Sequence, residues 1–182
     1  MERIRVHGRG GQGAVTFAHI LCASVSYEGK YGQSCMAPTF ERRGAPVEAY
    51  GRIGDKAIRE RGAVIKPDFV VVLNPKLATL VNLELGITEG GKIVVNSPKD
   101  LNFKHEAFYI DATSIALSIL KIPITNTVML GAFAAVTGLV SLSSLEMGAR
   151  IILSNFGEGK LNLNLDAIRA GYEEVDHGKA IY

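Results

Sequence analysis

Runs of apolar residues, some alternating with polar positions and some continuous, divide this chain of 182 residues into short strands and helices. The first alternation predicts a strand at residues 4–7, and a helical run follows at 14–28. Short apolar segments bounded by Gly, Pro or Asn predict further strands at 31–40, 47–53, 69–73, 92–96 and 108–110. The continuous run at 69–73 is typical of a strand that is covered on both faces.

From residue 112 onward, apolar positions recur at helical spacing. Asn126 or Thr127 is expected to cap the most apolar of these helices. The helices predicted after the first one lie at 76–83, 112–120, 127–142, 145–156 and 161–175, before a loose tail at 176–182. Strands that alternate with helices predict one α/β domain over residues 1–182, with a Rossmann-like sheet, helices on both of its faces and extra helices at the C-terminus.

The apolar run at 127–142 is shorter than the roughly 20 residues that a helix needs to span a bilayer. We therefore expect no membrane association, and we interpret the run as a helix buried on most sides or lying in a subunit interface. The formal net charge of +2 is too small to indicate nucleic acid as a partner. The chain enters its first strand at once, so we expect no signal peptide and a cytoplasmic location.

A glycine cluster joins the first predicted strand to the first predicted helix. Gly8, Gly10 and Gly13 match the pattern G-x-G-x-x-G in the strand–turn–helix context that this pattern requires. Glycines let the backbone turn sharply and approach a bound group closely. The free N–H groups and the dipole at the start of a helix attract an anion such as phosphate. Within the cluster, Arg9 can add a charge and Gln12 an amide contact, so we predict phosphate or pyrophosphate binding.

Two other interpretations of the glycine cluster remain. Glycines between a strand and a helix can serve packing alone. Binding of NAD requires an acidic residue about 20 positions further on, at the end of the second strand. Glu28 has this spacing, but it lies at the end of the predicted helix, before the second strand begins. The sequence therefore favours a phosphate-binding loop over ordinary NAD binding.

Polar residues follow several of the predicted strands. In an open α/β sheet, ligands bind beyond the carboxyl ends of the strands, so we expect these residues to converge near the glycine cluster. They are Asn74, Asn96, Ser97 and Asp111, together with residues 39–43.

Arginines form two groups in the first half of the chain. Arg42 and Arg43 lie in a loop, where they form either a solvated charge cluster or an anion-binding fork. Arg52, Arg59 and Arg61 are interspersed with acidic residues, and we interpret that stretch as a solvated face.

The sequence offers little for chemistry of its own. His7 ends the first strand, but no Ser, Cys or carboxylate partner is evident, so we expect it to be a spacer or a hydrogen-bonding residue at the pocket floor. Cys22 and Cys35 are too few for a disulfide framework or an iron–sulfur cluster, and we expect both to be buried thiols. No H-E-x-x-H, C-x-x-C or G-x-S-x-G motif is present. These features favour a ligand-holding module that completes the active site of another chain.

Taken together, these residues resemble the gamma subunit of the 2-oxoacid:ferredoxin oxidoreductases, and within that family the pyruvate synthase type. The similarity covers nearly the whole chain. The matching segments are Gly8-Arg9-Gly10-Gly11-Gln12-Gly13, Glu41-Arg42-Arg43-Gly44-Ala45-Pro46-Val47, Arg52-Ile53, Asn126-Thr127-Val128-Met129-Leu130-Gly131-Ala132 and Gly171-Tyr172.

The resemblance implies a complex that oxidatively decarboxylates a 2-oxoacid, joins the acyl group to coenzyme A and reduces ferredoxin, or runs in reverse. It implies alpha, beta and delta partner subunits that hold thiamine diphosphate and iron–sulfur clusters, and a gamma subunit that helps to bind coenzyme A. The residues that it assigns to coenzyme A are Gly8, Arg9, Gly10, Gly11, Gln12, Gly13, Arg42 and Arg43.

Three functional alternatives follow. The complex acts on pyruvate, or on 2-oxoglutarate, 2-oxoisovalerate or indolepyruvate. The chain is a stand-alone nucleotide-binding dehydrogenase of the NAD type. The chain is a structural assembly subunit whose glycine cluster binds nothing. The first alternative is expected, with pyruvate as the substrate.

Overall fold

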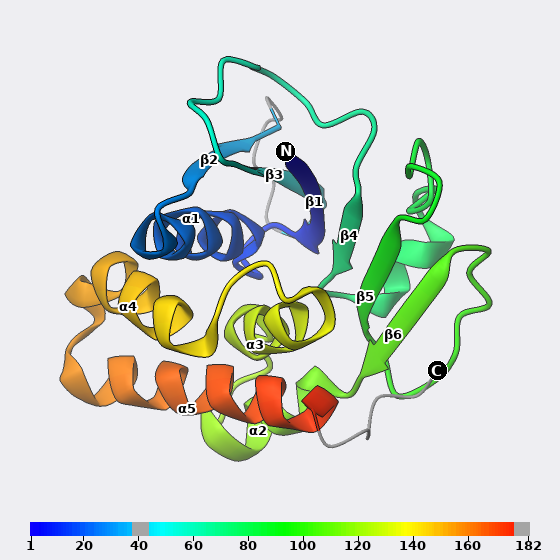
Figure 1. Ribbon diagram of the computed structural model, residues 1–182. Helices are drawn as coiled ribbons and strands as arrows, with labels where there is room; N and C mark the ends of the chain where they lie inside the picture. Colours follow the sequence, from blue (N-terminus) through cyan, green and yellow to red (C-terminus); the bar gives the residue numbers. More distant parts are fainter. Residues whose placement is uncertain (38–43, 177–182) are drawn as a thin grey trace.

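The computed structural model describes residues 1–37 and 44–176, and within them the sheet has six strands in the order β2-β3-β1-β4-β5-β6 (Figure 1). The strand bounds are β1 (Glu2–Arg9), β2 (Tyr31–Met36), β3 (Pro46–Gly54), β4 (Phe69–Val72), β5 (Lys92–Asn96) and β6 (Glu106–Ile110). β1 pairs antiparallel with β3, which pairs antiparallel with β2. On its other side, β1 begins a parallel series with β4, β5 and β6. β1 is thus the boundary between the two halves of the sheet.

The α-helices gather on one face of the sheet, as Figure 1 shows. They are α1 (Ala14–Val25), α2 (Ala112–Ile119), α3 (Asn126–Thr137), α4 (Leu142–Ile152) and α5 (Glu158–Asp176). Phe133 of α3 packs edge-to-face against Phe17 of α1 and Phe69 of β4, with ring centroids 5.8 and 5.7 Å apart. This aromatic cluster lies in the larger core, between the sheet and the helical layer.

The opposite face is covered mainly by the 3-10 helix η2 (Pro75–Thr79) and the irregular segments around it. Leu77 and Leu83 pack there against Val70, Val72 and Ile93 in a second, smaller core. The expected α/β class is confirmed, with the extra helices at the C-terminus. Helices were expected on both faces of the sheet, and that part of the prediction is wrong: among the described residues, the α-helices lie on one face and the second face carries η2 and irregular segments. The helix predicted at 76–83 is a 3-10 helix that ends at Thr79.

The most apolar helix, α3, is buried within the chain itself. Its residues from Asn126 to Ala134 are all buried. It crosses α5 at two glycines, Gly131 and Gly171. The helices are so close there that a Cβ on Gly131 would overlap the carbonyl oxygen of Ile168, and a Cβ on Gly171 would overlap that of Val128. The first of the two interpretations of the apolar run, a helix covered on most sides, is therefore confirmed. Over residues 1–37 and 44–176, no helix combines the length and apolarity needed to cross a bilayer.

Several helix ends differ from the sequence prediction. Thr125 is the N-cap of α3 and its side chain makes no capping bond, so the predicted capping role of Asn126 or Thr127 is wrong. α4 begins at Leu142 because Ser141 caps it by accepting a hydrogen bond from the N–H of Ser144. α1 ends at Val25 and continues as the 3-10 helix η1 (Ser26–Glu28), and a further one, η3 (Ser154–Phe156), follows α4. Of the tail predicted at 176–182, Asp176 is the last residue of α5, and residues 177–182 lie outside the described residues.

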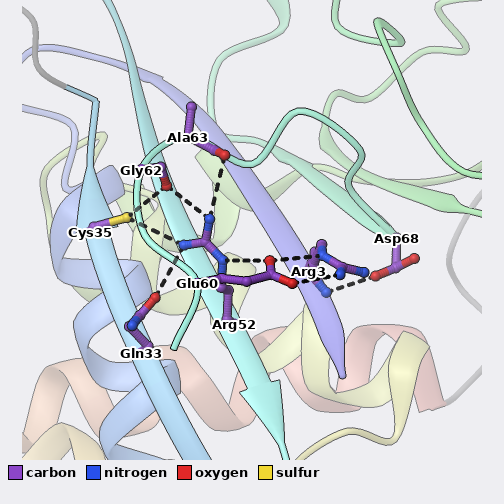
Figure 2. A network of polar contacts seen from close by, with 8 residues as sticks. All are labelled: Arg3, Gln33, Cys35, Arg52, Glu60, Gly62, Ala63 and Asp68. Carbon is purple, nitrogen blue, oxygen red and sulfur yellow. Dashed lines mark hydrogen bonds and ion pairs between the residues drawn. The ribbon is translucent and has the colours of Figure 1, made fainter. Parts of the chain in front are cut away.

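Arg52 is buried, with only 2% of its surface exposed, and it fastens the long segment between β3 and β4 to the sheet (Figure 2). Its guanidinium donates to the carbonyl oxygens of Gly62 at 2.9 Å and Ala63 at 3.4 Å, and to Gln33 of β2 at 3.2 Å. Glu60 lies 3.6 Å from its Nε. The interpretation of Arg52 as part of a solvated face is therefore wrong. A buried guanidinium with five donors can satisfy several carbonyl groups of an irregular segment at once.

Candidate anion-binding site

The predicted glycine cluster forms a tight turn between the end of β1 at Arg9 and the start of α1 at Ala14. Gly11 and Gly13 have φ values of 90° and 79°, which disfavour any residue with a side chain. A Cβ on Gly13 would also overlap the side-chain amide of Asn126. Gly8 lies under the turn, where a Cβ would be 3.2 Å from that of Ala14. The turn thus depends on glycine both for its conformation and for its close packing.

The first N–H groups of α1 are free of intrahelical bonds. The first hydrogen bond of the helix runs from the N–H of Phe17 to the carbonyl oxygen of Gly13 at 2.9 Å. Gly13 is the N-cap and provides no capping side chain. No acceptor within the described part of the chain pairs with the N–H groups of Ala14, Val15 and Thr16. They carry the positive end of the helix dipole, so this turn attracts an anion.

Arg9 adds a cationic group beside these amides. Its Nε is buried and has no hydrogen-bond partner among residues 1–37 and 44–176. The residue lines a cavity of about 310 Å³ with Gly10, Gly11, Val15 and Thr16, among others. A buried donor without an acceptor is costly unless a ligand supplies one. Arg9 therefore fits the bound anion that the helix amides also favour.

Gln12 stabilises the turn through its side-chain oxygen, which is therefore not free to contact a ligand. Its Oε1 accepts the N–H of Arg9 at 2.9 Å and the side-chain amide of Asn74 at 3.4 Å. The predicted amide contact of Gln12 with a ligand is thus limited to its NH₂ group. Asn74, at the end of β4, is brought to the glycine turn as the sheet topology predicts.

A second turn closes over the glycine turn. The N–H of Gly10 donates to the carbonyl oxygen of Ala45 at 2.9 Å, and the N–H of Gly44 donates to that of Gly10 at 3.3 Å. Gly44 directly follows Arg42 and Arg43, which lie outside the described residues. The role predicted for those two arginines stays a prediction.

The remaining polar strand ends serve the fold. Asp111 caps α2 by accepting from the N–H of Ser114 at 3.0 Å, and Asn96 bonds to the carbonyl oxygen of Leu73 and to Thr113. Glu28 accepts from the N–H of Ser141 at 2.7 Å, so its carboxylate ties α4 to the end of α1. Asn96 and Asp111 are therefore not brought into the site, and Glu28 is not placed to bind a ribose.

His7 has a carboxylate neighbour that the sequence did not reveal. Glu48 of β3 lies opposite His7, with 3.6 Å between Oε1 and Nδ1, and its Oε2 accepts the hydroxyl of Tyr50 at 2.6 Å. Arg5 donates from Nε to His7 Nε2 at 3.0 Å. Burial lowers the pKa of His7 to about 4, helped by Arg5 and opposed by Glu48. The imidazole is therefore neutral at pH 7, with its proton on Nδ1.

The two cysteines, Cys22 of α1 and Cys35 of β2, are both free thiols. Burial raises the pKa of Cys22 to about 12, so this thiol stays protonated. Cys35 is only partly buried and lies 3.7 Å from a guanidinium nitrogen of Arg52 (Figure 2), so the prediction of two buried thiols holds for Cys22 alone. In the described segments, no three His, Cys, Asp or Glu side chains are grouped to hold a metal ion.

Two residues at the site were not assigned to it from the sequence. Thr16 lies in the first turn of α1 and lines the cavity beside Arg9. Asn126 directs its side-chain amide toward the carbonyl oxygen of Gly13, at 3.5 Å. Both also line a second cavity of about 550 Å³ on the other side of the turn. Thr16 follows the glycine motif by three residues, which is the position that a helix start would indicate, whereas the approach of Asn126 depends on tertiary packing.

Comparisons with known proteins agree with the family resemblance expected from the sequence. The family model described as pyruvate ferredoxin/flavodoxin oxidoreductase matches residues 3–174. Pyruvate synthase subunit PorC of Methanocaldococcus jannaschii is 46% identical over 177 residues, which is 96% of this chain and 97% of that protein. The "pyruvate/ketoisovalerate oxidoreductases common subunit gamma" of Thermococcus litoralis is 45% identical over 184 aligned residues, which cover 96% of this chain and 97% of that protein. The crystal structure of pyruvate oxidoreductase subunit PORC from Thermotoga maritima superposes with a TM-score of 0.81 at 37% identity. The match covers 94% of this chain and 95% of that chain.

Proposed function

Because the chain belongs to the pyruvate ferredoxin/flavodoxin oxidoreductase family, we propose that it is the gamma subunit of a pyruvate:ferredoxin oxidoreductase and that it binds coenzyme A there. The complex releases the carboxylate of pyruvate as CO₂, transfers the acetyl group to the thiol of coenzyme A and passes two electrons to ferredoxin. In the reverse direction it makes pyruvate from acetyl-CoA and CO₂. Thiamine diphosphate and iron–sulfur clusters belong to the alpha, beta and delta partners. The isolated chain has no activity in this proposal.

One observation carries the assignment of coenzyme A: the unpaired N–H groups at the start of α1 lie beside a buried guanidinium nitrogen that also lacks a partner in the described residues. Coenzyme A presents a diphosphate and a 3′-phosphate, and these are the groups that such donors bind. Gly8, Gly10, Gly11 and Gly13 let the backbone approach the phosphates, Arg9 supplies charge, and Gln12 keeps the turn in shape. Arg42 and Arg43 are proposed as further phosphate ligands.

The choice of 2-oxoacid is proposed to lie with the partner subunits. A relative named for both pyruvate and ketoisovalerate oxidoreductases is a common gamma subunit, so that one gamma subunit serves two substrates. Pyruvate is proposed for this complex because the Methanocaldococcus jannaschii relative is named a pyruvate synthase subunit.

The substitution Thr16→Glu tests the phosphate site. A carboxylate in the first turn of α1 stabilises the helix through its dipole, so the variant folds, but it repels a bound phosphate. The KM for coenzyme A in the assembled complex should rise about tenfold or more. The control is Thr16→Gln, because glutamine has the size of glutamate but no charge, and it should change the KM by less than about threefold. An unchanged KM for Thr16→Glu in a fully assembled complex would contradict coenzyme A binding here. If assembly falls while the KM stays constant, the turn is structural.

A further inference from the structure

A second cavity adjoins the glycine turn, and its lining is mostly apolar. Its volume is about 550 Å³, within the range of small-molecule sites. It lies between the connection from α2 to α3, the end of α4 with η3, and the first half of α5. Its apolar lining residues, which we call the apolar groove, are Leu120, Ile122, Ile124, Leu153, Phe156 and Leu163.

The apolar groove is continuous with the proposed phosphate site. Gly11, Gly13 and Thr16 line both cavities. The start of α1 therefore lies between the cavity lined by Arg9 and a groove that is largely apolar. A ligand whose phosphates occupy the start of α1 has its next group at the mouth of the groove.

Several side chains of the groove are unusually open to solvent. The exposed fractions are 47% for Ile122, 56% for Phe156 and 41% for Leu163. Water around such a cluster is unfavourable, and a ligand with apolar segments removes it. A few polar groups accompany the apolar ones: the amides of Asn126 and Asn164, and Lys160. Asn164 is held in place by Thr127, whose hydroxyl donates to its Oδ1 at 3.1 Å.

We propose that the apolar groove binds the pantetheine arm of coenzyme A, an inference that rests on the function proposed above. This arm is attached to the diphosphate and alternates apolar segments, including a gem-dimethyl group, with two amides. That composition matches a groove with apolar walls and a few amide side chains. The cavity beside Arg9 is left for the adenosine end, whose 3′-phosphate needs a cation. The groove thus directs the thiol away from the start of α1.

The test uses the assembled complex and two ligands, coenzyme A and adenosine 3′,5′-bisphosphate, which lacks the arm. The variant is Ile122→Ser with Leu163→Ser, and the control is Leu117→Ser, an apolar residue of α2 with 47% exposure that does not line the groove. The double variant should raise the KM for coenzyme A about tenfold, and leave the inhibition constant of the bisphosphate within about twofold. The control should change neither value. If the double variant does not assemble, Leu163→Ala alone carries the same expectation with a smaller ratio.

The outcomes separate this inference from the function on which it rests. An unchanged KM for the groove variant, while Thr16→Glu still raises it, overturns the groove assignment and leaves the phosphate site intact. Equal weakening of coenzyme A and the bisphosphate places the adenosine end in the groove and also overturns the inference. Poor assembly with a normal KM assigns the groove to a subunit contact. If neither Thr16→Glu nor the groove variant changes the KM, the proposed function itself fails.

Discussion

Burial keeps His7 neutral although the carboxylate of Glu48 lies 3.6 Å from its Nδ1. His7 lies near the end of β1, beside the glycine turn. Its neighbours Glu48 and Tyr50 come from β3, which lies antiparallel beside β1 although some forty residues separate them. Arg52, also on β3, is buried as well, and it donates to the carbonyl oxygen of Gly62 in the irregular segment that follows this strand.

The neutral state of His7 predicts a dependence of stability on pH. Its pKa is about 4 in the folded chain, against 6.5 for the ordinary group, because it is buried. As the pH falls below 6.5, His7 becomes protonated in the unfolded chain, whereas in the folded chain it stays neutral until the pH approaches 4. The free energy of unfolding of the isolated chain should therefore be greatest above pH 6.5 and fall by about 3 kcal/mol on going to pH 4. Denaturant titrations followed by circular dichroism measure this.

The variant His7→Gln should reduce this loss, because glutamine does not titrate and can still accept the hydrogen bond from Arg5. His19→Gln, at an exposed position on α1, is the control for removing an imidazole. A pH dependence of the same size in His7→Gln and in the unaltered chain would show that burial of His7 is not its cause.

At the scale of elements, the glycine turn and the central strands were predictable because each depends on a short, local pattern. The helix ends were less predictable, since the start of α4 depends on one capping bond to Ser141 and the start of η2 on one to Asn74. Gly131 and Gly171 appeared in the sequence only as parts of the family resemblance. The structure gives their physical reason, which is the close crossing of α3 and α5.

The crossing predicts that Gly171→Ala destabilises the chain. The added Cβ would overlap the carbonyl oxygen of Val128, which is backbone and cannot move away without separating the helices. The loss should be about 1–3 kcal/mol or more in the free energy of unfolding. Gly159→Ala is the matched control on the same helix, where a Cβ meets nothing within 4 Å, and it should be neutral or stabilise by up to about 1 kcal/mol. Equal effects of the two substitutions on thermal melting would contradict the crossing.

At the scale of the molecule, the candidate site arises where the two halves of the sheet meet. β1 ends between an antiparallel partner and a parallel one. Its last residues pair with β3 on one side, and on the other side Asn74, which follows β4, reaches Gln12 of the glycine turn. The apolar groove adds residues from the connection between α2 and α3, from the end of α4 with η3, and from α5. The sequence predicted the glycine turn, which we propose as the phosphate site. It did not predict the groove, because the groove exists only where helices far apart in sequence pack together.

The most direct test is a structure of the assembled complex with coenzyme A bound. The account predicts density for the diphosphate within hydrogen-bond distance of the N–H groups of Ala14, Val15 and Thr16, with Arg9 beside it. Coenzyme A bound wholly on other subunits, with the start of α1 empty or covered by a partner side chain, would contradict the account.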